Sequence, residues 1–246
     1  MSSYQFKISG FADEAGVTAE EQMNALEKNG IRMLELRGVD GKGVLDHDEA
    51  SLKTLAEKLK SRGFSVSAIG SPIGKTPIED DFSAVLENFR KTLKAAEIFK
   101  APYIRAFSFY MPKDKDPMLY AGEVIRRLKE LVKRAEDQGV EYALENESGI
   151  FTNVPERCVY VLDRIPCLRL IFDPGNFIME GADVLKAWEL LKNRIAYFHI
   201  KDGITSPERR NCPAGEGIGH IPEILKDAYA AGFDSILSIE PHLFYL

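Results

Sequence analysis

Cysteine is scarce in this 246-residue sequence, and long hydrophobic runs are absent. The three cysteines, Cys158, Cys167 and Cys212, form no C-x-x-C pair, which argues against zinc-finger spacing and a disulfide framework. We therefore expect reduced thiols in a cytoplasmic protein. No segment approaches the roughly 20 apolar residues of a transmembrane helix, and the N-terminal MSSYQFKISG lacks the apolar core of a signal peptide.

The sequence also has fewer basic residues than acidic ones, 32 against 38. The formal net charge of −6 argues against nucleic acid as a partner, because phosphate neutralisation requires a basic face. The content of 45% hydrophobic and 28% charged residues is typical of a globular protein. The length suits one α/β barrel, and no linker rich in Pro, Gly or Ser divides the chain. We predict a single domain over residues 1–246, with no membrane partner.

One pattern recurs along the chain: an amphipathic helical segment ends at a glycine, and a β-rich run follows. Glycine accepts the left-handed conformation that ends a helix. The pattern occurs at Gly30, Gly63, Gly139 and Gly232. Completing the alternation predicts strands near 4–9, 31–37, 64–70, 103–108, 140–145, 168–173, 195–200 and 235–240. Helices are predicted near 18–29, 48–62, 81–99, 117–138, 154–164, 182–192 and 220–231. Strict alternation implies parallel strands, and eight repeats favour a closed (β/α)8 TIM barrel.

The last strand–helix unit of the pattern is incomplete in this sequence. The last predicted strand ends near Glu240 and the sequence stops at Leu246, so the eighth helix is predicted to be short or absent. The outer face of the first and last strands then lacks its usual cover. The apolar tail HLFYL could pack there, or a partner subunit could, which makes a homodimer an open alternative.

Acids and a histidine follow four successive strands. They are Glu145, Asp173, His199 and Glu240. In such barrels the carboxyl ends of the strands share one face. Buried carboxylates that converge repel one another unless a cation holds them. The set therefore predicts one divalent ion, with Mn²⁺, Mg²⁺, Co²⁺ and Zn²⁺ all compatible.

Each of these residues also has an ordinary structural interpretation. His199 could be a hydrogen-bonded structural histidine, and Asp173 could make an Asx turn. Glu145 and Glu240 could pair with Arg105 or Lys201. Four consecutive strands that end in this way favour the metal site.

Other polar residues near the strand ends are weaker candidates. We predict substrate contacts from Arg105, Glu147, Asn176, Lys201 and His242. Glu35 and Arg37, which end the second predicted strand, could pair with each other. The glycine-rich segment 213–219 matches no dinucleotide or P-loop fingerprint, and it is either a mobile lid or the turn before a helix.

At these residues the sequence resembles the sugar phosphate isomerase/epimerase superfamily, the xylose-isomerase-like TIM barrels. The resemblance spans nearly the whole chain. It is carried by GFADEAG, LELRGVDGK, AIGSPIGK, YIRAFSFY, LENE, FDPGN, HIKDG, PAGEG and SIEPH. It implies that Glu145, Asp173, His199 and Glu240 hold the metal, and that Glu145 and Glu240 also act as acid and base. Ketose epimerases of this family often have a histidine at the position of Asn176, so this chain departs from them there.

The implied reaction is metal-dependent sugar isomerisation or epimerisation. A proton is removed next to a carbonyl, and the metal stabilises the resulting enediolate. A polyol or inosose-type dehydratase would use the same groups, and a non-catalytic sugar-binding barrel is a further alternative. The DNA-repair endonuclease of this fold needs many histidines, whereas this acidic chain has 4. The expected partner is a small sugar or sugar derivative, and the absence of a phosphate-binding motif favours an unphosphorylated sugar or a sugar acid.

Overall fold

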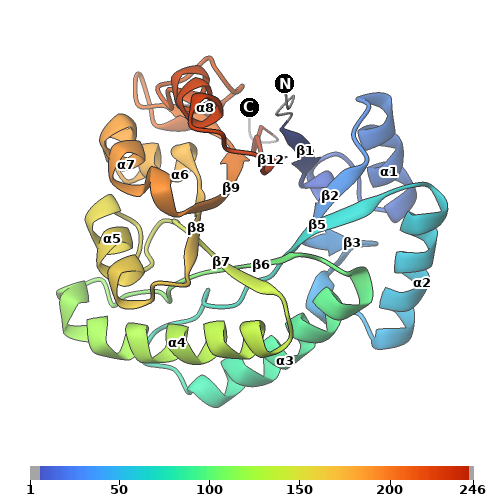
Figure 1. The fold of residues 1–246 in the computed structure, drawn as a ribbon, viewed down its shortest axis with the longest axis horizontal. Helices are drawn as coiled ribbons and strands as arrows, with labels where there is room; N and C mark the ends of the chain where they lie inside the picture. Colours follow the sequence, from blue (N-terminus) through green and yellow to red (C-terminus); the bar gives the residue numbers. More distant parts are fainter. Residues whose placement is uncertain (1–5, 244–246) are drawn as a thin grey trace.

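The computed structural model describes residues 6–243. Eight parallel strands form one sheet in the order β1-β12-β9-β8-β7-β6-β5-β2. β1 and β2 approach each other at the seam, so the barrel is nearly closed and the TIM-barrel prediction is confirmed (Figure 1). The strands are β1 (Lys7–Gly10), β2 (Met33–Leu36), β5 (Ser65–Gly70), β6 (Tyr103–Ala106), β7 (Glu141–Glu145), β8 (Arg169–Phe172), β9 (Ile195–Ile200) and β12 (Ile236–Ile239).

Helices surround this sheet (Figure 1). The seven predicted helices correspond to α1 (Ala19–Lys28), α2 (Glu49–Ser61), α3 (Phe82–Phe99), α4 (Ala121–Asp137), α5 (Pro155–Arg164), α7 (Val184–Leu191) and α8 (Ile221–Ala230). Thr18 and Glu21 form a capping box at the start of α1. Gly30, Gly63, Gly139 and Gly232 have φ of 71°, 74°, 70° and 83°, which confirms their predicted role after the helices. No helix between residues 6 and 243 combines the length and apolar character needed to cross a bilayer.

The helix–sheet layer is apolar, whereas the interior of the barrel combines small and aromatic side chains with buried polar ones such as Glu35 and Arg105. Inside the barrel, Ala68, Ala143 and Ala196 are small and fully buried, and they leave room for the ring of Tyr197. Large side chains such as Phe89, Phe172 and Phe198 pack between sheet and helices. This arrangement follows the alternation of side chains along each strand, and it points polar residues at the strand ends into the barrel mouth.

Several short elements extend the loops at the carboxyl ends of the strands. The sequence did not predict the helix α6 (Pro174–Met179), whose first turn is capped by Asp173. It also did not predict two hairpins, β3 (Gly38–Val39) with β4 (Lys42–Gly43), and β10 (Asp202–Ile204) with β11 (Arg210–Cys212). The remaining short elements are the 3-10 turns η1 (Ala12–Glu14), η2 (Val44–Asp46), η3 (Pro117–Tyr120) and η4 (Lys192–Arg194).

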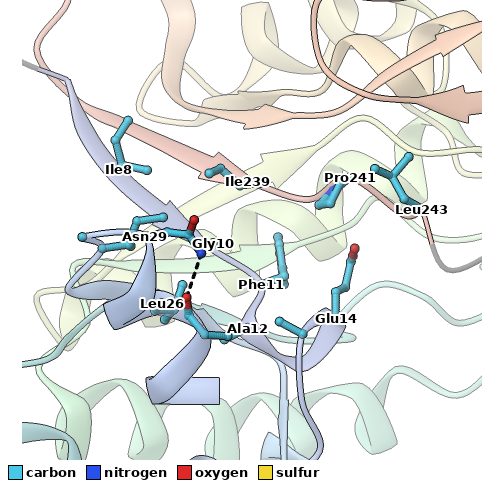
Figure 2. A pocket seen from close by; sticks show the side chains of 14 residues that line it. Ile8, Gly10, Phe11, Ala12, Glu14, Leu26, Asn29, Ile239, Pro241 and Leu243 are labelled. Atoms are coloured by element: carbon cyan, nitrogen blue, oxygen red, sulfur yellow. Dashed lines mark hydrogen bonds between the residues drawn. The ribbon is translucent and has the colours of Figure 1, made fainter. Parts of the chain in front are cut away.

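An apolar groove lies on the outer side of the barrel, beside β1 and β12 (Figure 2). Its volume is ≈ 720 Å³, and it is lined mainly by aliphatic side chains, including Ile8 and Ile239. In the described part of the chain no helix follows β12, so these two isoleucines remain 41% and 37% exposed. Leu243 lines the groove, whereas the rest of the predicted packing segment, residues 244–246, lies outside the described residues.

Candidate metal centre

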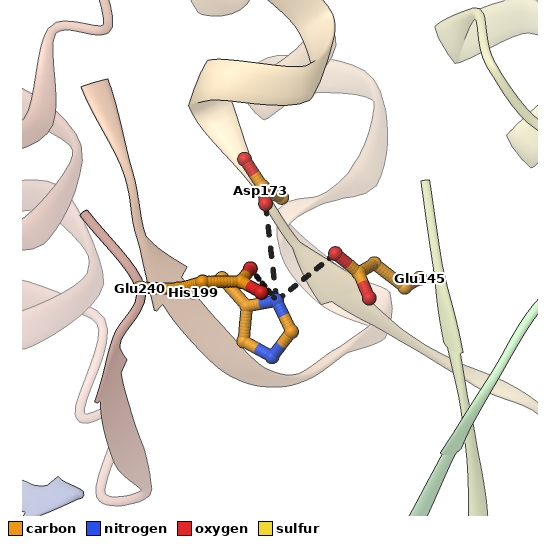
Figure 3. A group of neighbouring side chains, drawn as sticks. All are labelled: Glu145, Asp173, His199 and Glu240. Carbon is orange, nitrogen blue, oxygen red and sulfur yellow. Dashed lines mark hydrogen bonds and ion pairs between the residues drawn. The ribbon is translucent and has the colours of Figure 1, made fainter. Parts of the chain in front are cut away.

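Four side chains converge at the carboxyl ends of adjacent strands (Figure 3). Glu145 ends β7, Asp173 follows β8, His199 lies near the end of β9, and Glu240 follows β12. One ligand atom from each residue lies within 4.8 Å of those of the other three. Every one of these side chains is at most 3% exposed. The parallel register brings them together, because Ser238 of β12 is the partner of His199 and Glu240 comes two residues later.

Three carboxylate oxygens surround a single ring nitrogen. Nδ1 of His199 lies 3.1 Å from Glu145 Oε1, 3.4 Å from Glu240 Oε2 and 3.8 Å from Asp173 Oδ2. One N–H group could donate to only one of these oxygens. Asp173 Oδ2 is buried and accepts no well-directed hydrogen bond, although Lys201 Nζ lies 2.7 Å away. An arrangement of oxygens and one nitrogen about a common point fits a divalent cation better than it fits a proton.

Glu35 on β2 completes the surroundings of His199. Its Oε2 lies 3.2 Å from His199 Nε2, and Tyr197 Oη donates to its Oε1 at 2.9 Å. A proton on Nε2 that is donated to Glu35 leaves the Nδ1 lone pair directed at the three acids. Carboxylates commonly fix metal-binding histidines in this way. The sequence analysis considered Glu35 only as a partner of Arg37, and the signal for its inward role is an acid between two buried leucines in MLEL.

Cations lie around the cluster. Arg105 Nη1 is 3.1 Å from Glu145 Oε2, and Lys201 Nζ is 3.3 Å from Glu240 Oε2. Arg37 Nη1 is 2.7 Å from Glu240 Oε1, while its other nitrogens bind Asp13. Arg37 and Glu35 therefore have different partners, and the pairing considered from the sequence is wrong.

These charges set the protonation states. Burial opposes ionisation of Glu145, but His199 and Arg105 outweigh it and lower the pKa of Glu145 to about 2. For Glu240, burial is outweighed by Lys201, His242 and His199, so its pKa lies well below the usual value. Burial dominates at Asp173 and raises its pKa despite Lys201.

The pKa of His199 is raised, in contrast to those of Glu145 and Glu240. Burial disfavours the imidazolium, but Glu145 and Glu35 outweigh burial and raise the pKa of His199 well above 6.5. A cation bound at Nδ1 would replace that proton, so its binding would release a proton to solvent.

The Glu35 contact leads to a testable prediction. In Glu35→Gln, the neutral amide is a weaker acceptor than the carboxylate, and its single oxygen would have to serve both Tyr197 Oη and the Nε2–H of His199, so the tautomer with a proton on Nε2 is held less firmly. We expect Mn²⁺ affinity to fall by about 10–100-fold, measured by the EPR signal of free Mn²⁺. Glu141→Gln, at the other end of the barrel, is the matched control, because Glu141 pairs with Arg169. Unchanged affinity in a folded Glu35→Gln protein would show that Glu35 does not position His199.

The predicted substrate residues fall into two groups. Arg105 is buried, donates to Glu145 and to the Gly70 carbonyl, and lies over the rings of Phe11 and Phe107. Arg105 therefore stabilises the buried carboxylate of Glu145. The other residues, Glu147, Asn176, Lys201 and His242, line a cavity of ≈ 360 Å³ at the mouth.

This cavity is connected to the cluster by residues that contact both. Asn176 Nδ2 donates to Glu145 Oε1 at 3.2 Å, and Lys201 Nζ contacts Asp173 and Glu240. His242 Nε2 lies 3.0 Å from Glu240 Oε1. Glu147 is at the rim, 2.8 Å from Lys75 Nζ. Asn176, Lys201 and His242 therefore lie between the cavity and the four convergent side chains and contact both.

Asp202, which the sequence analysis did not select, fixes the loop beside this cavity. Its buried carboxylate accepts the backbone N–H groups of Gly203, Gly215, Gly217 and Gly219 at 2.8–3.1 Å. A Cβ at Gly217 would lie 2.3 Å from Asp202 Oδ1, so only glycine permits this approach. The glycine-rich segment 213–219 thus surrounds one carboxylate with its backbone N–H groups. In the sequence, Asp202-Gly203 followed by Gly215, Gly217 and Gly219 could have indicated this contact.

The fold and the cluster define a class: a TIM barrel with a buried candidate metal centre at the carboxyl ends of its strands. The family model described as xylose isomerase-like TIM barrel matches residues 23–243. The chain therefore belongs to the xylose isomerase-like TIM barrel family. A comparison with curated proteins found no match.

Solved structures share this fold. An IOLI protein with a binding zinc atom is 19% identical, with a TM-score of 0.78 over 96% of this chain and 89% of that one. An L-ribulose 3-epimerase is 17% identical, with a TM-score of 0.75 over 98% of this chain and 83% of that one. The probable 3-DHS dehydratase AsbF of Bacillus anthracis is 17% identical, with a TM-score of 0.76 over 96% and 92%. At these identities the similarity establishes the common fold.

Proposed function

We propose that this protein is a divalent-metal-dependent isomerase or epimerase that acts on a sugar or sugar derivative. The observation that carries the proposal is the convergence of Glu145, Asp173 and Glu240 on Nδ1 of His199, with Nε2 held by Glu35. Family membership and the occurrence of an epimerase among the proteins of similar fold support it. When bound, a divalent ion would act as a Lewis acid on the substrate carbonyl and stabilise the charge that develops on its oxygen.

Glu145 and Glu240 are assigned as the acid–base pair. They come from β7 and β12, which are separated in the sheet by β8 and β9, so they approach the centre from different sides. The low pKa of each keeps both carboxylates ionised and free to accept a proton, and polarisation of the substrate carbonyl by a bound cation would reduce the basicity needed to remove the proton from the neighbouring carbon. The glutamate that has become protonated can return its proton to the adjacent carbon, whereas delivery to the opposite face requires the other glutamate to take up a proton from solvent first.

The neighbouring cations control this exchange. Lys201 lies between Asp173 and Glu240, and it lines the cavity. Its ammonium group can donate to a substrate hydroxyl or carbonyl oxygen that enters from the cavity. Arg37 holds Glu240 from the opposite edge through Oε1 and leaves Oε2 directed towards His199 and Lys201. Arg105 does the same for Glu145, because it occupies Oε2 while Oε1 faces the centre.

Proton exchange with solvent tests the proposal. The protein, loaded with Mn²⁺, is incubated with a panel of ketoses in deuterated water, and NMR follows the carbon next to the carbonyl. We expect deuterium incorporation with formation of an isomer or epimer, and its loss after treatment with a chelator. A product that has lost water would instead indicate a dehydratase, the reaction named for one protein of similar fold. Mn²⁺ binding without exchange on any ketose would contradict the proposal and favour a sugar-binding role.

A further inference from the structure

Cationic side chains dominate the cavity at the mouth, although the whole chain is acidic. The lining includes Lys201, Arg209 and Arg210, against one carboxylate, Glu147. Lys201 is occupied by Asp173 and Glu240, and Glu147 is occupied by Lys75. The charge left to act on a ligand is therefore that of the two arginines.

Neither arginine is paired with an acid within the described residues 6–243. Arg209 donates from Nη1 to the backbone carbonyl of Met179, and the side chain of Arg210 makes no hydrogen bond or ion pair there. Several other arginines have carboxylate partners, as at Arg62, Arg126 and Arg134, whereas Arg164 and Arg194 donate to backbone carbonyls, as Arg209 does. Among the arginines of residues 6–243, Arg210 is the one whose guanidinium group has no hydrogen bond or ion pair, and both guanidinium groups at the cavity retain unused donors.

The backbone beneath them is held firmly. Arg210 lies on β11, where it pairs with Ile204 of β10, and Asp202 at the start of β10 anchors the surrounding loop through four backbone N–H groups. A hairpin fixed in this way presents the arginines at a constant position and reduces the ordering cost of binding.

A buried acceptor lies beside them. Asn211 Oδ1 is shielded from solvent, has no hydrogen-bond partner, and belongs to a residue that lines the same cavity. A sugar hydroxyl can donate to this oxygen. The cavity thus combines donors for an anion with an acceptor for a hydroxyl, within the size range of small-molecule sites.

We propose that the substrate carries an anionic group, a carboxylate or a phosphate, at the end remote from the candidate metal centre, and that Arg210 binds it with help from Arg209. The inference rests on the proposed sugar chemistry at Glu145 and Glu240. Guanidinium groups suit both anions, because their paired N–H groups match two oxygens of a carboxylate or phosphate. A neutral sugar would leave both arginines without a partner.

Calorimetry with unreactive probes tests this subsite apart from catalysis. Metal-free protein is titrated with ribitol, ribonate and ribitol 5-phosphate, and with the six-carbon counterparts sorbitol, gluconate and sorbitol 6-phosphate. We expect one class of anionic probe to bind at least about tenfold more tightly than its polyol, since hydrogen bonds to charged groups are strong. Preference for the aldonate identifies a carboxylate subsite, and preference for the phosphorylated polyol identifies a phosphate subsite.

Variants assign the effect to the arginines. Arg210→Gln should weaken the preferred anion by about 10–100-fold and leave the polyol unchanged. Arg90→Gln, on the exposed surface of α3, removes the same charge and should change neither. Equal binding of polyol and anions, no measurable anion binding, or a preference that survives in the Arg209→Gln/Arg210→Gln protein would overturn the subsite. Loss of solvent exchange with the anion preference intact would overturn only the isomerase proposal.

Discussion

Replacing Glu240 with glutamine should abolish proton exchange between ketose and solvent, with a fall in rate of about 10²–10⁴-fold, the usual contribution of a general acid or base. Glutamine keeps an oxygen that can face a cation but cannot carry the proton. The substitution also removes a buried negative charge that contacts Arg37, Lys201 and His242, so some loss of stability accompanies it.

The assay must separate chemistry from folding and from metal binding. Thermal unfolding and metal content are therefore measured on the same Glu240→Gln sample. Glu145→Gln should give a comparable loss, whereas Glu189→Gln, which affects only an exposed pair with Lys192, should leave exchange unchanged. A folded, metal-replete Glu240→Gln protein with full turnover would refute the assignment of Glu240 as acid or base.

Asp202→Asn should loosen the loop that borders the cavity. The amide nitrogen of asparagine would face backbone N–H groups that now donate to a carboxylate oxygen, such as those of Gly215 and Gly217. These two donors are partly buried, and donors left unsatisfied cost about 1–3 kcal/mol each, so we expect a local loss of about 2–4 kcal/mol. Hydrogen exchange at Gly215 and Gly217 should accelerate by roughly 30–1,000-fold.

The same experiment has an internal reference. Amides in β7 and β8, in the centre of the sheet, should keep their protection, because the effect is confined to the hairpin and its loop. Asp234→Asn, at an exposed position before β12, provides the matched control. Unchanged protection of Gly215 and Gly217 in Asp202→Asn would mean that the carboxylate does not organise this loop.

Local signals account for the elements that the sequence predicted correctly. Glycines in the left-handed region ended the helices at Gly30, Gly63, Gly139 and Gly232, and short apolar runs followed each of them. The carboxyl ends of parallel strands lie at one face of the barrel. The predicted strands therefore also predicted that Glu145, Asp173, His199 and Glu240 lie together. The structure places these four together, while their roles remain predictions for the experiments above.

Other features depend on contacts between distant segments. Glu35 and His199 are 164 positions apart, and Arg37 and Glu240 are 203 apart. No local periodicity encodes such pairs, since a side chain at a strand end has several possible partners in the mouth. The two hairpins and α6 were missed because each is too short to show a period.

The sequence by itself determined the alternation of strands and helices, and therefore the barrel and the face that carries its acids and histidine. Only the tertiary structure showed that Glu35 contacts His199, that Asp202 accepts hydrogen bonds from the glycine-rich loop, and that Arg209 and Arg210 have no acidic partner among residues 6–243 beside the cavity. The physical reason is that strand and helix signals extend over a few residues, whereas hydrogen bonds and ion pairs in the mouth depend on distances that exist only after the barrel has closed.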